Sequence, residues 1–227
     1  MRARFFGKDR KLLQHRLVRQ ASSLVLSYPD DRLSERLSVV DSLLGHVTGE
    51  PRRMLVGTVE ALRGMDFYTA QTDYVATFDL NRGTTLYLTY WTAGDTRNRG
   101  SAMHTFVQAY GRAGRCSPGS EAPDHLAVAL EFAATVDPVA GQQLLSEHRV
   151  ALDILHGALI ERGSLYAPTI GAVCATLPPV TDQELRRARR LAETGPAAEA
   201  IGLQPFTLTV PPRRQATPGA ARAEGVR

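Results

Sequence analysis

The sequence predicts an all-α fold, a single-domain helical bundle of about nine to ten helices. The main evidence is periodicity, because apolar residues recur at steps of three and four along most of the 227 residues. Proline and glycine stand at the ends of many of these segments and divide them into helices of ordinary length. With 43% hydrophobic residues and no internal repeat, the chain is expected to form one helical domain over residues 1–195.

The first part of the chain predicts three helices. Residues 11–27 form the first, and an apolar stripe over 33–47 forms the second after the Pro29-Asp30-Asp31 turn. Pro51 suits the first turn of the third helix, which ends at Gly64.

Residues 67–78 predict a fourth helix, but the segment after it is ambiguous. The run Thr84-Thr-Leu-Tyr-Leu-Thr-Tyr-Trp91 has the β-branched and aromatic content of a strand. A single strand has nothing to pair with, and no second strand is evident. We therefore expect a buried helix here, with aromatic side chains on more than one face.

Capping signals predict the middle helices. One begins near Asp95-Thr96 and ends at Gly114, and Pro123 opens a short helix over 123–133.

The last part of the chain predicts the longest helix and two shorter ones. Asp137-Pro138 suits the N-cap and first position of the longest helix, which runs to Gly163. Further helices are expected over 166–177 and 181–195. Residues 196–227 are rich in Pro, Ala and Arg with few apolar anchors, which predicts a largely disordered tail.

The charge is unevenly distributed along the chain. The net charge of +4 divides into +6 for residues 1–19, −5 for 20–181 and +3 for 182–227. An acidic body with basic ends suits a cationic peptide partner better than nucleic acid, which binds to basic faces. One alternative stays open, a helical regulatory protein that contacts nucleic acid through its basic termini. The absence of a recognisable helix-turn-helix with base-reading residues weighs against it.

No catalytic or metal-binding motif is recognisable. The sequence lacks a nucleophile elbow, a phosphate-binding loop and a His-Glu-x-x-His motif, and His148 and His156 have no further ligands at a suitable spacing. We therefore expect no enzyme activity, no metal and no cofactor. Cys116 and Cys174 form no disulfide framework, and no apolar run approaches the roughly 20 residues that cross a bilayer. These features favour the cytoplasm.

Aromatic and acidic residues concentrate between positions 74 and 133. The chain's single tryptophan, Trp91, follows two tyrosines, and a Glu-Ala-Pro-Asp-His run occupies 121–125. This concentration predicts a binding surface.

Three segments of this region resemble the NarJ-type chaperones, also called the delta subunit of respiratory nitrate reductase. They are Tyr74-Val-Ala-Thr-Phe-Asp79, Leu86-Tyr-Leu-Thr-Tyr-Trp-Thr-Ala-Gly-Asp-Thr-Arg-Asn-Arg-Gly100 and Pro123-Asp-His-Leu-Ala-Val-Ala-Leu-Glu-Phe-Ala133. The resemblance covers roughly residues 10–195 and implies the helical fold of the redox-enzyme maturation family, to which the TorD and DmsD chaperones belong. It also implies a chaperone that binds the N-terminal leader of the nitrate reductase alpha subunit and assists molybdenum cofactor insertion.

The resemblance suggests how such a leader, amphipathic and basic, would be held. Aromatic rings would take its apolar face and carboxylates its Arg or Lys side chains, in an electronegative hollow. The expected peptide-binding residues are Tyr87, Tyr90, Trp91, Asp95, Glu121, Asp124 and His125.

Each of these residues also has a plainer interpretation. Large aromatic rings belong to the core about as often as to a groove, and Asp124 suits the start of a helix. His125 suits a structural hydrogen bond or a response to pH near neutrality.

Overall fold

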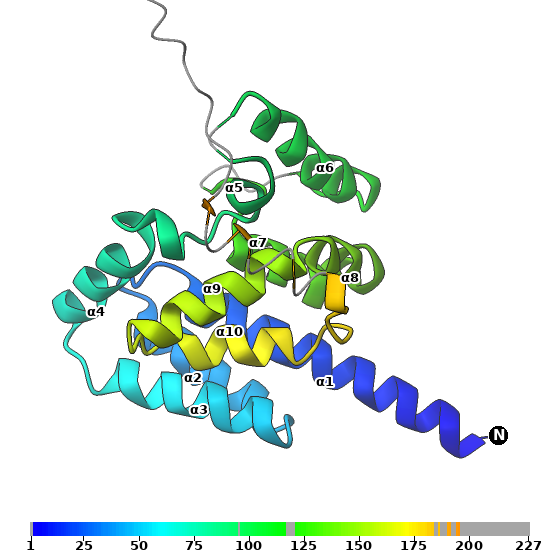
Figure 1. Ribbon diagram of the computed structural model, residues 1–227. Helices are drawn as coiled ribbons and strands as arrows, with labels where there is room; N and C mark the ends of the chain where they lie inside the picture. The colour runs from blue at the N-terminus through cyan, green and yellow to red at the C-terminus, as the bar shows by residue number, and fades with distance from the viewer. Residues whose placement is uncertain are drawn as a thin grey trace, which may run out of the picture.

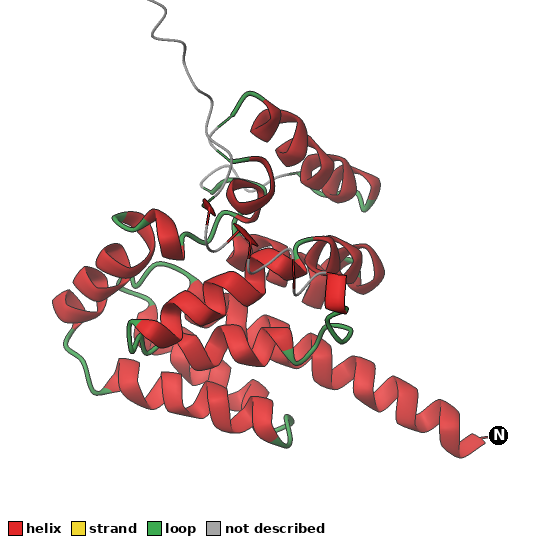
Figure 2. Ribbon diagram, in the orientation of Figure 1, coloured by secondary structure: helices red, strands yellow, loops and turns green. Residues whose placement is uncertain are grey.

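The computed structural model describes residues 2–94, 96–116, 121–183, 186, 190–191 and 194–195. In this part of the chain all regular secondary structure is helical apart from one isolated β-bridge (Figure 2), which confirms the all-α prediction. The predicted tail over 196–227 lies outside the described residues. The α-helices are α1 Arg2–Leu26, α2 Leu33–Leu44, α3 Glu50–Arg63, α4 Phe67–Tyr74, α5 Leu88–Ala93, α6 Asn98–Arg112, α7 Leu126–Glu131, α8 Pro138–Glu147, α9 Arg149–Glu161 and α10 Ala167–Cys174.

The longest of these helices is α1, which runs along the body and contacts α2, α3, α7 and α10. Its N-terminal end projects beyond the other helices, at the right of Figure 1. The sequence predicted that this helix starts at Lys11, whereas it starts at Arg2. Residues 2–10 contain no proline and mostly good helix formers, so nothing ends the helix earlier.

The predicted apolar stripes of the second and third helices form the core. Leu37, Val40, Leu55 and Val59 are all buried, and α3 packs against α10. The second helix is shorter than predicted, because it ends at Leu44. Val47 is nevertheless buried, and it lies in the loop that leads to α3.

The longest helix that the sequence predicted, over 138–163, is divided into α8 and α9 at His148. The N-cap prediction at its start is confirmed, since the Asp137 carboxylate accepts hydrogen bonds from Val139 N and Ala140 N. At His148 the backbone leaves the helical region, with φ −102° and ψ 18°. The His148 ring is buried against Phe106, with ring centroids 5.1 Å apart, and this tertiary contact accompanies the break that periodicity did not indicate.

Two α-helices end in π-helical turns, a feature absent from the sequence prediction. The helix α4 continues into η1, Val75–Asp79, and α7 continues into η3, Phe132–Val136. The turn η3 packs closely on α8, where Gly141 faces Ala133. A short 3₁₀ turn, η2, Arg82–Thr84, leads from η1 towards α5.

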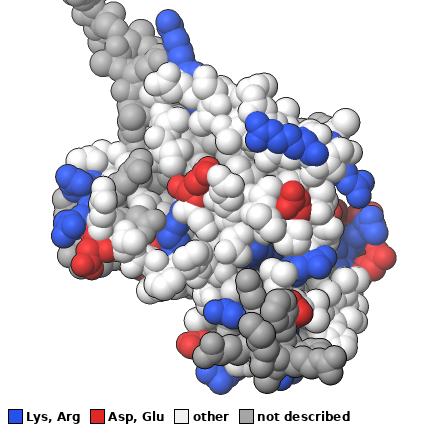
Figure 3. All heavy atoms as spheres, turned by 90° about the vertical axis from the view of Figure 1, so that its right-hand side faces the viewer, with Lys and Arg blue, Asp and Glu red and all other residues white. Residues whose placement is uncertain are grey.

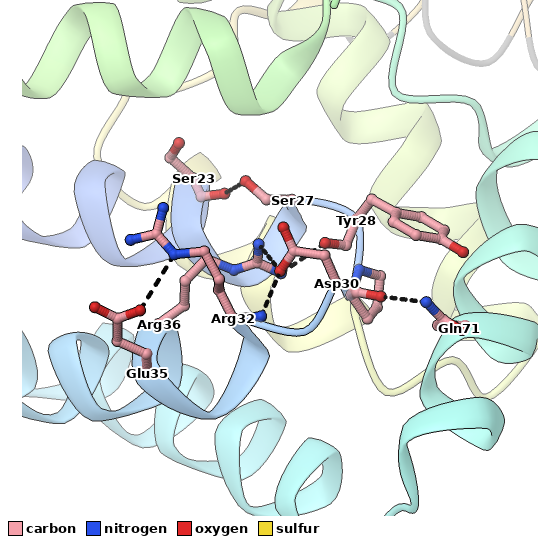
Figure 4. Close-up of polar contacts among 9 residues, drawn as sticks. Ser23, Ser27, Tyr28, Asp30, Arg32, Glu35, Arg36 and Gln71 are labelled. Carbon is pink, nitrogen blue, oxygen red and sulfur yellow. Dashed lines mark hydrogen bonds and ion pairs between the residues drawn. The ribbon is translucent and has the colours of Figure 1, made fainter. Parts of the chain in front are cut away.

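A polar network fixes the turn between α1 and α2 (Figure 4). The Arg36 guanidinium contacts the Asp30 carboxylate at 2.7 Å and donates to the Tyr28 carbonyl at 2.6 Å. The Gln71 side chain, from α4, donates to the Pro29 carbonyl at 2.9 Å. This turn therefore connects α1 and α2 with the helix that leads to the aromatic and acidic segments.

Candidate functional site

The segment 84–91 is not one helix, and the sequence prediction was wrong for its first half. Thr85 and Tyr87 have extended backbone angles, and Tyr87 forms an antiparallel β-bridge with His125. Leu88 N donates to the Asp124 carbonyl at 3.1 Å, and Leu126 N donates to the Leu86 carbonyl at 2.9 Å. The strand-like residues therefore find a partner in the loop before α7, and helix α5 begins only at Leu88.

Asp124 is fully buried at the N-terminal end of α5. Its Oδ2 accepts a hydrogen bond from Thr89 N at 3.1 Å and a second one from the Thr89 hydroxyl. The Arg99 guanidinium lies 4.0 Å from the same oxygen. A carboxylate in this position satisfies a free N–H group of the helix and complements its positive end. Asp124 thus stabilises a helix end, but of α5 and not of the helix that follows it in the sequence.

His125 lies beside Asp124 and is 6% exposed. Its ring packs edge-on against the Tyr87 ring, with centroids 5.4 Å apart. Burial lowers the pKa of His125, although Glu121, Asp124 and Asp79 act in the opposite direction. The imidazole is therefore neutral near pH 7.

Trp91 is also buried, with 5% of its surface exposed. Its Nε1 donates to the Thr85 carbonyl at 3.3 Å, and its ring packs against Tyr90, with centroids 5.7 Å apart. Of the two interpretations left open for this ring, the core position is the observed one. Trp91 fixes the position of Tyr90 from beneath.

A pocket of about 360 Å³ opens beside these buried residues. Tyr87 and Tyr90, both half-buried, are the two expected site residues that line it. The other lining residues come from η1, the turn after it and α6: Phe78, Asp79, Asn81, Arg82, Thr85 and Arg99.

The pocket lining carries both signs of charge, whereas the sequence predicted an electronegative hollow. Arg82 and Arg99 line the pocket together with Asp79. The Arg99 guanidinium lies 5.3 Å from the centroid of the Tyr87 ring, a cation–π arrangement. The sequence analysis did not place Arg99 in the site, because its contact with Tyr87 joins two segments that only the fold brings together.

Two carboxylates lie at the exposed edge of this site. Glu121 accepts a hydrogen bond from the Tyr87 hydroxyl at 3.3 Å. Asp79 is exposed as a residue. The pKa of its carboxyl is nevertheless raised, because the carboxyl is partly desolvated and lies near Glu121, and these effects outweigh the opposite effect of His125. The sequence analysis did not place Asp79 in the site, although Asp79 is the last residue of the first of the three segments that resemble NarJ-type chaperones. Asp95, which it did place there, lies outside the described residues.

Within the described ranges, no group of three or more His, Cys, Asp or Glu side chains is arranged to hold a metal ion. None of the described helices is both long and apolar enough to span a membrane.

The chain is similar in sequence to proteins of known families. The profile of a family described as nitrate reductase delta subunit matches residues 48–170. The nitrate reductase-like protein NarX of Mycobacterium tuberculosis is 50% identical over 160 residues, which cover 70% of this chain and 24% of NarX. The chain therefore spans about a quarter of the length of that relative.

Two chaperones match over more of their own length. The probable nitrate reductase molybdenum cofactor assembly chaperone NarJ of Bacillus subtilis is 28% identical over 158 residues, 69% of this chain and 86% of that protein. Escherichia coli NarJ, a nitrate reductase molybdenum cofactor assembly chaperone, is 30% identical over 148 residues, 64% of this chain and 63% of NarJ.

A solved structure shares the fold. A crystal structure from Archaeoglobus fulgidus, described as a redox enzyme maturation protein, superposes with a TM-score of 0.53 at 25% identity. The match covers 70% of this chain and 91% of the other.

Proposed function

Because the chain belongs to the nitrate reductase delta subunit family, we propose that it is an assembly chaperone for a nitrate reductase. In this proposal it acts in the cytoplasm on the alpha subunit and assists molybdenum cofactor insertion. The relatives that this chain matches over most of their own length are named assembly chaperones, which agrees with the prediction that the chain is not an enzyme.

The pocket beside Tyr87 and Tyr90 is the proposed place for the N-terminal leader of that subunit. The observation that carries the proposal is the combination of two accessible aromatic rings with two exposed carboxylates, Asp79 and Glu121, at one pocket. Tyrosine rings offer a large apolar face with little loss of side-chain entropy, and carboxylates at the rim suit a basic peptide. An amphipathic, basic leader fits both features.

The expected site residues then have two kinds of role. Tyr87, Tyr90 and Glu121 would contact the leader, and Asp79 joins them. Trp91, Asp124 and His125 are too buried for contact and would hold the contact residues in position. A role for Asp95 in binding the leader stays a prediction.

Removing the two rim charges tests the electrostatic part of this proposal. Exposed ion pairs contribute about 0.2–1 kcal/mol each, so the Asp79→Asn, Glu121→Gln double variant should bind a synthetic leader about two- to thirtyfold more weakly in calorimetry. The Glu60→Gln, Glu161→Gln variant removes the same charge from exposed positions on α3 and α9 and should bind as the parent does.

Removing a ring tests the aromatic part. Tyr90→Ala should weaken leader binding by more than tenfold, because a partly buried aromatic anchor carries much of the energy of such an interface. The control is Tyr68→Ala, a ring on α4 that is 77% exposed. Parental affinity in both Tyr90→Ala and the rim double variant would exclude this pocket as the site. A parent chain that does not bind the leader at all would contradict the function itself.

The nucleic-acid alternative has a separate test. DNA binding through basic termini should weaken steeply as salt rises, since it releases counterions from the phosphates. A leader held largely by aromatic packing should lose much less affinity over the same salt range.

A further inference from the structure

Arg19, near the middle of α1, is a fully buried guanidinium without a carboxylate partner. Its Nε donates to Thr176 Oγ1 at 3.1 Å, and its Nη2 is 3.2 Å from the Thr176 carbonyl and 3.3 Å from Gln142 Oε1. Its Nη1 has no hydrogen-bond partner. No ion pair of Arg19 with an Asp or Glu is present within the described residues.

An unpaired buried cation is costly, which makes the position of Arg19 informative. A charge that leaves water without an opposite charge costs several kcal/mol, even after the surroundings relax. Burial accordingly lowers the pKa of Arg19 to about 10. The chain alone therefore carries a positive charge that its own described residues do not neutralise.

A cleft of about 330 Å³ lies next to Arg19, between α1, the loop before α3 and the end of α10. Arg10, Lys11, His15, Thr48 and Thr176 are among the residues that line it. Thr176 is also the residue to which Arg19 donates, so the guanidinium lies directly behind one wall of the cleft.

Three basic residues of α1 are arranged on one face. Lys11, His15 and Arg19 follow one another at intervals of four residues, which places them in one row along the helix. Burial lowers the pKa of His15, and the charges of Arg19 and Lys11 lower it further. Like charges in such a row repel one another, and within the described part of the chain no carboxylate pairs with them.

The start of α3 adds a further positive end at the edge of this cleft. Its N-cap, Gly49, provides no side-chain hydrogen bond, and Thr48 and Pro51 on either side of it line the cleft. The acidic residue of that first turn, Glu50, is exposed. The face towards which the N-terminal end of α1 projects carries both Lys or Arg and Asp or Glu side chains (Figure 3).

We propose that this cleft binds a phosphoryl group of a small molecule, with Lys11 and His15 in contact and Arg19 supplying charge from behind Thr176. A phosphoryl group carries up to two negative charges and accepts several hydrogen bonds, which matches clustered cations and a helix N-terminus. The concave shape favours one or two phosphates over an extended polyanion such as a duplex.

Inorganic pyrophosphate is the probe, measured by calorimetry at fixed ionic strength. The Arg10→Gln, Lys11→Gln double variant, which changes two exposed side chains at the rim, should bind pyrophosphate at least about tenfold more weakly than the parent. The matched control is Arg112→Gln, Arg162→Gln, which removes the same charge from exposed ends of α6 and α9 and should bind as the parent does.

Thermal unfolding tests the part assigned to Arg19. Pyrophosphate should raise the unfolding midpoint of the parent and raise that of a folded Arg19→Met variant much less. If Arg19→Met does not fold, the rim variant and its control decide the question. Equal losses in the rim variant and its control, or no pyrophosphate binding by the parent, would overturn the proposal. Tighter binding of citrate than of pyrophosphate would overturn the assignment to a phosphoryl group.

Discussion

At the scale of single residues, Asp124 shows how a side chain that resembles a ligand-binding group can serve the fold. Its carboxylate joins the loop before α7 to the first turn of α5 through Thr89. Of the two tyrosines of the pocket, Tyr87 immediately precedes that turn and Tyr90 lies within it. Any change at Asp124 therefore reaches the leader site indirectly, through the position of α5.

Asp124→Ala should lower the free energy of unfolding by about 1–3 kcal/mol, because it leaves the buried Thr89 N–H and hydroxyl without their acceptor. Asp124→Asn keeps an acceptor oxygen and should cost less. Urea denaturation followed by circular dichroism measures both, with the exposed Asp31→Ala as control. An Asp124→Ala loss no larger than that of the control would contradict the capping role.

The buried histidines His125 and His148 predict sensitivity to mild acid. Burial lowers the pKa of each in the folded chain, so each takes up its proton more readily in the unfolded chain, near pH 6.5. The unfolded state then binds more protons in the window below pH 6.5, and stability is full above that pH and is lost as the pH falls through it.

The urea midpoint of the parent should therefore decrease between pH 7.5 and 5.5. The urea midpoint of His148→Gln should decrease less over the same range. His104→Gln, a change at an exposed histidine of α6, should leave the pH dependence as it is. Parallel curves for the parent and His148→Gln would show that burial of this ring does not cause the dependence.

At the scale of elements, the sequence predicts helices well where capping and periodicity agree. The Asp137 cap and the stripes of α2 and α3 were predicted because their signals lie within a few residues of each other. The bridge between Tyr87 and His125 was missed because it joins residues far apart in the sequence and involves too few residues to produce an alternating pattern. The break at His148 likewise coincides with a contact to Phe106, which belongs to another helix.

The crossing of η3 and α8 gives a test of packing between elements. A Cβ at Gly141 would lie 2.4 Å from both Cα and Cβ of Ala133, so Gly141→Ala must push the two segments apart. We expect a loss of about 1–3 kcal/mol in stability, measured by urea denaturation.

Gly157 in α9 is the matched control, because a Cβ there meets nothing within 4 Å. Gly157→Ala should increase stability by up to about 1 kcal/mol through helix propensity. Similar effects of the two changes would contradict the close approach of η3 to α8.

At the scale of the whole molecule, the two proposed sites use different residues and different elements. The leader pocket is built from η1, α5 and α6, whereas the phosphoryl cleft is built from α1, the loop before α3 and the end of α10. We therefore expect the two affinities to vary independently.

The rim variant of the cleft, Arg10→Gln with Lys11→Gln, should bind the leader with the parental dissociation constant. The pocket variant, Asp79→Asn with Glu121→Gln, should bind pyrophosphate as the parent does. Calorimetry of both variants with both ligands tests this independence, and a loss of both affinities in either variant would indicate one shared site or a general change of fold.

The class of the fold was predicted from the sequence, whereas only Tyr87 and Tyr90 of the expected site residues line the pocket proposed for the leader. The aromatic and acidic segments do meet, but Trp91 and Asp124 lie beneath the pocket, while Asp79, Arg82 and Arg99 line it. Tertiary packing decides which side of a short, irregular segment faces solvent. Such a segment has no apolar periodicity from which its buried side could be predicted. The charge imbalance at Arg19 was hidden for the same reason, since burial of one arginine among basic neighbours becomes evident only in three dimensions.

The long reach of α1 has a consequence for synthesis on the ribosome. Arg16 donates to the carbonyl of Ala134, and Arg19 donates to Thr176, so α1 receives these partners from residues that are translated well after it. The nascent chain must therefore carry an uncovered amphipathic segment until most of the polypeptide has emerged. A chain truncated before Thr176 should therefore leave this segment of α1 without the partner of Arg19.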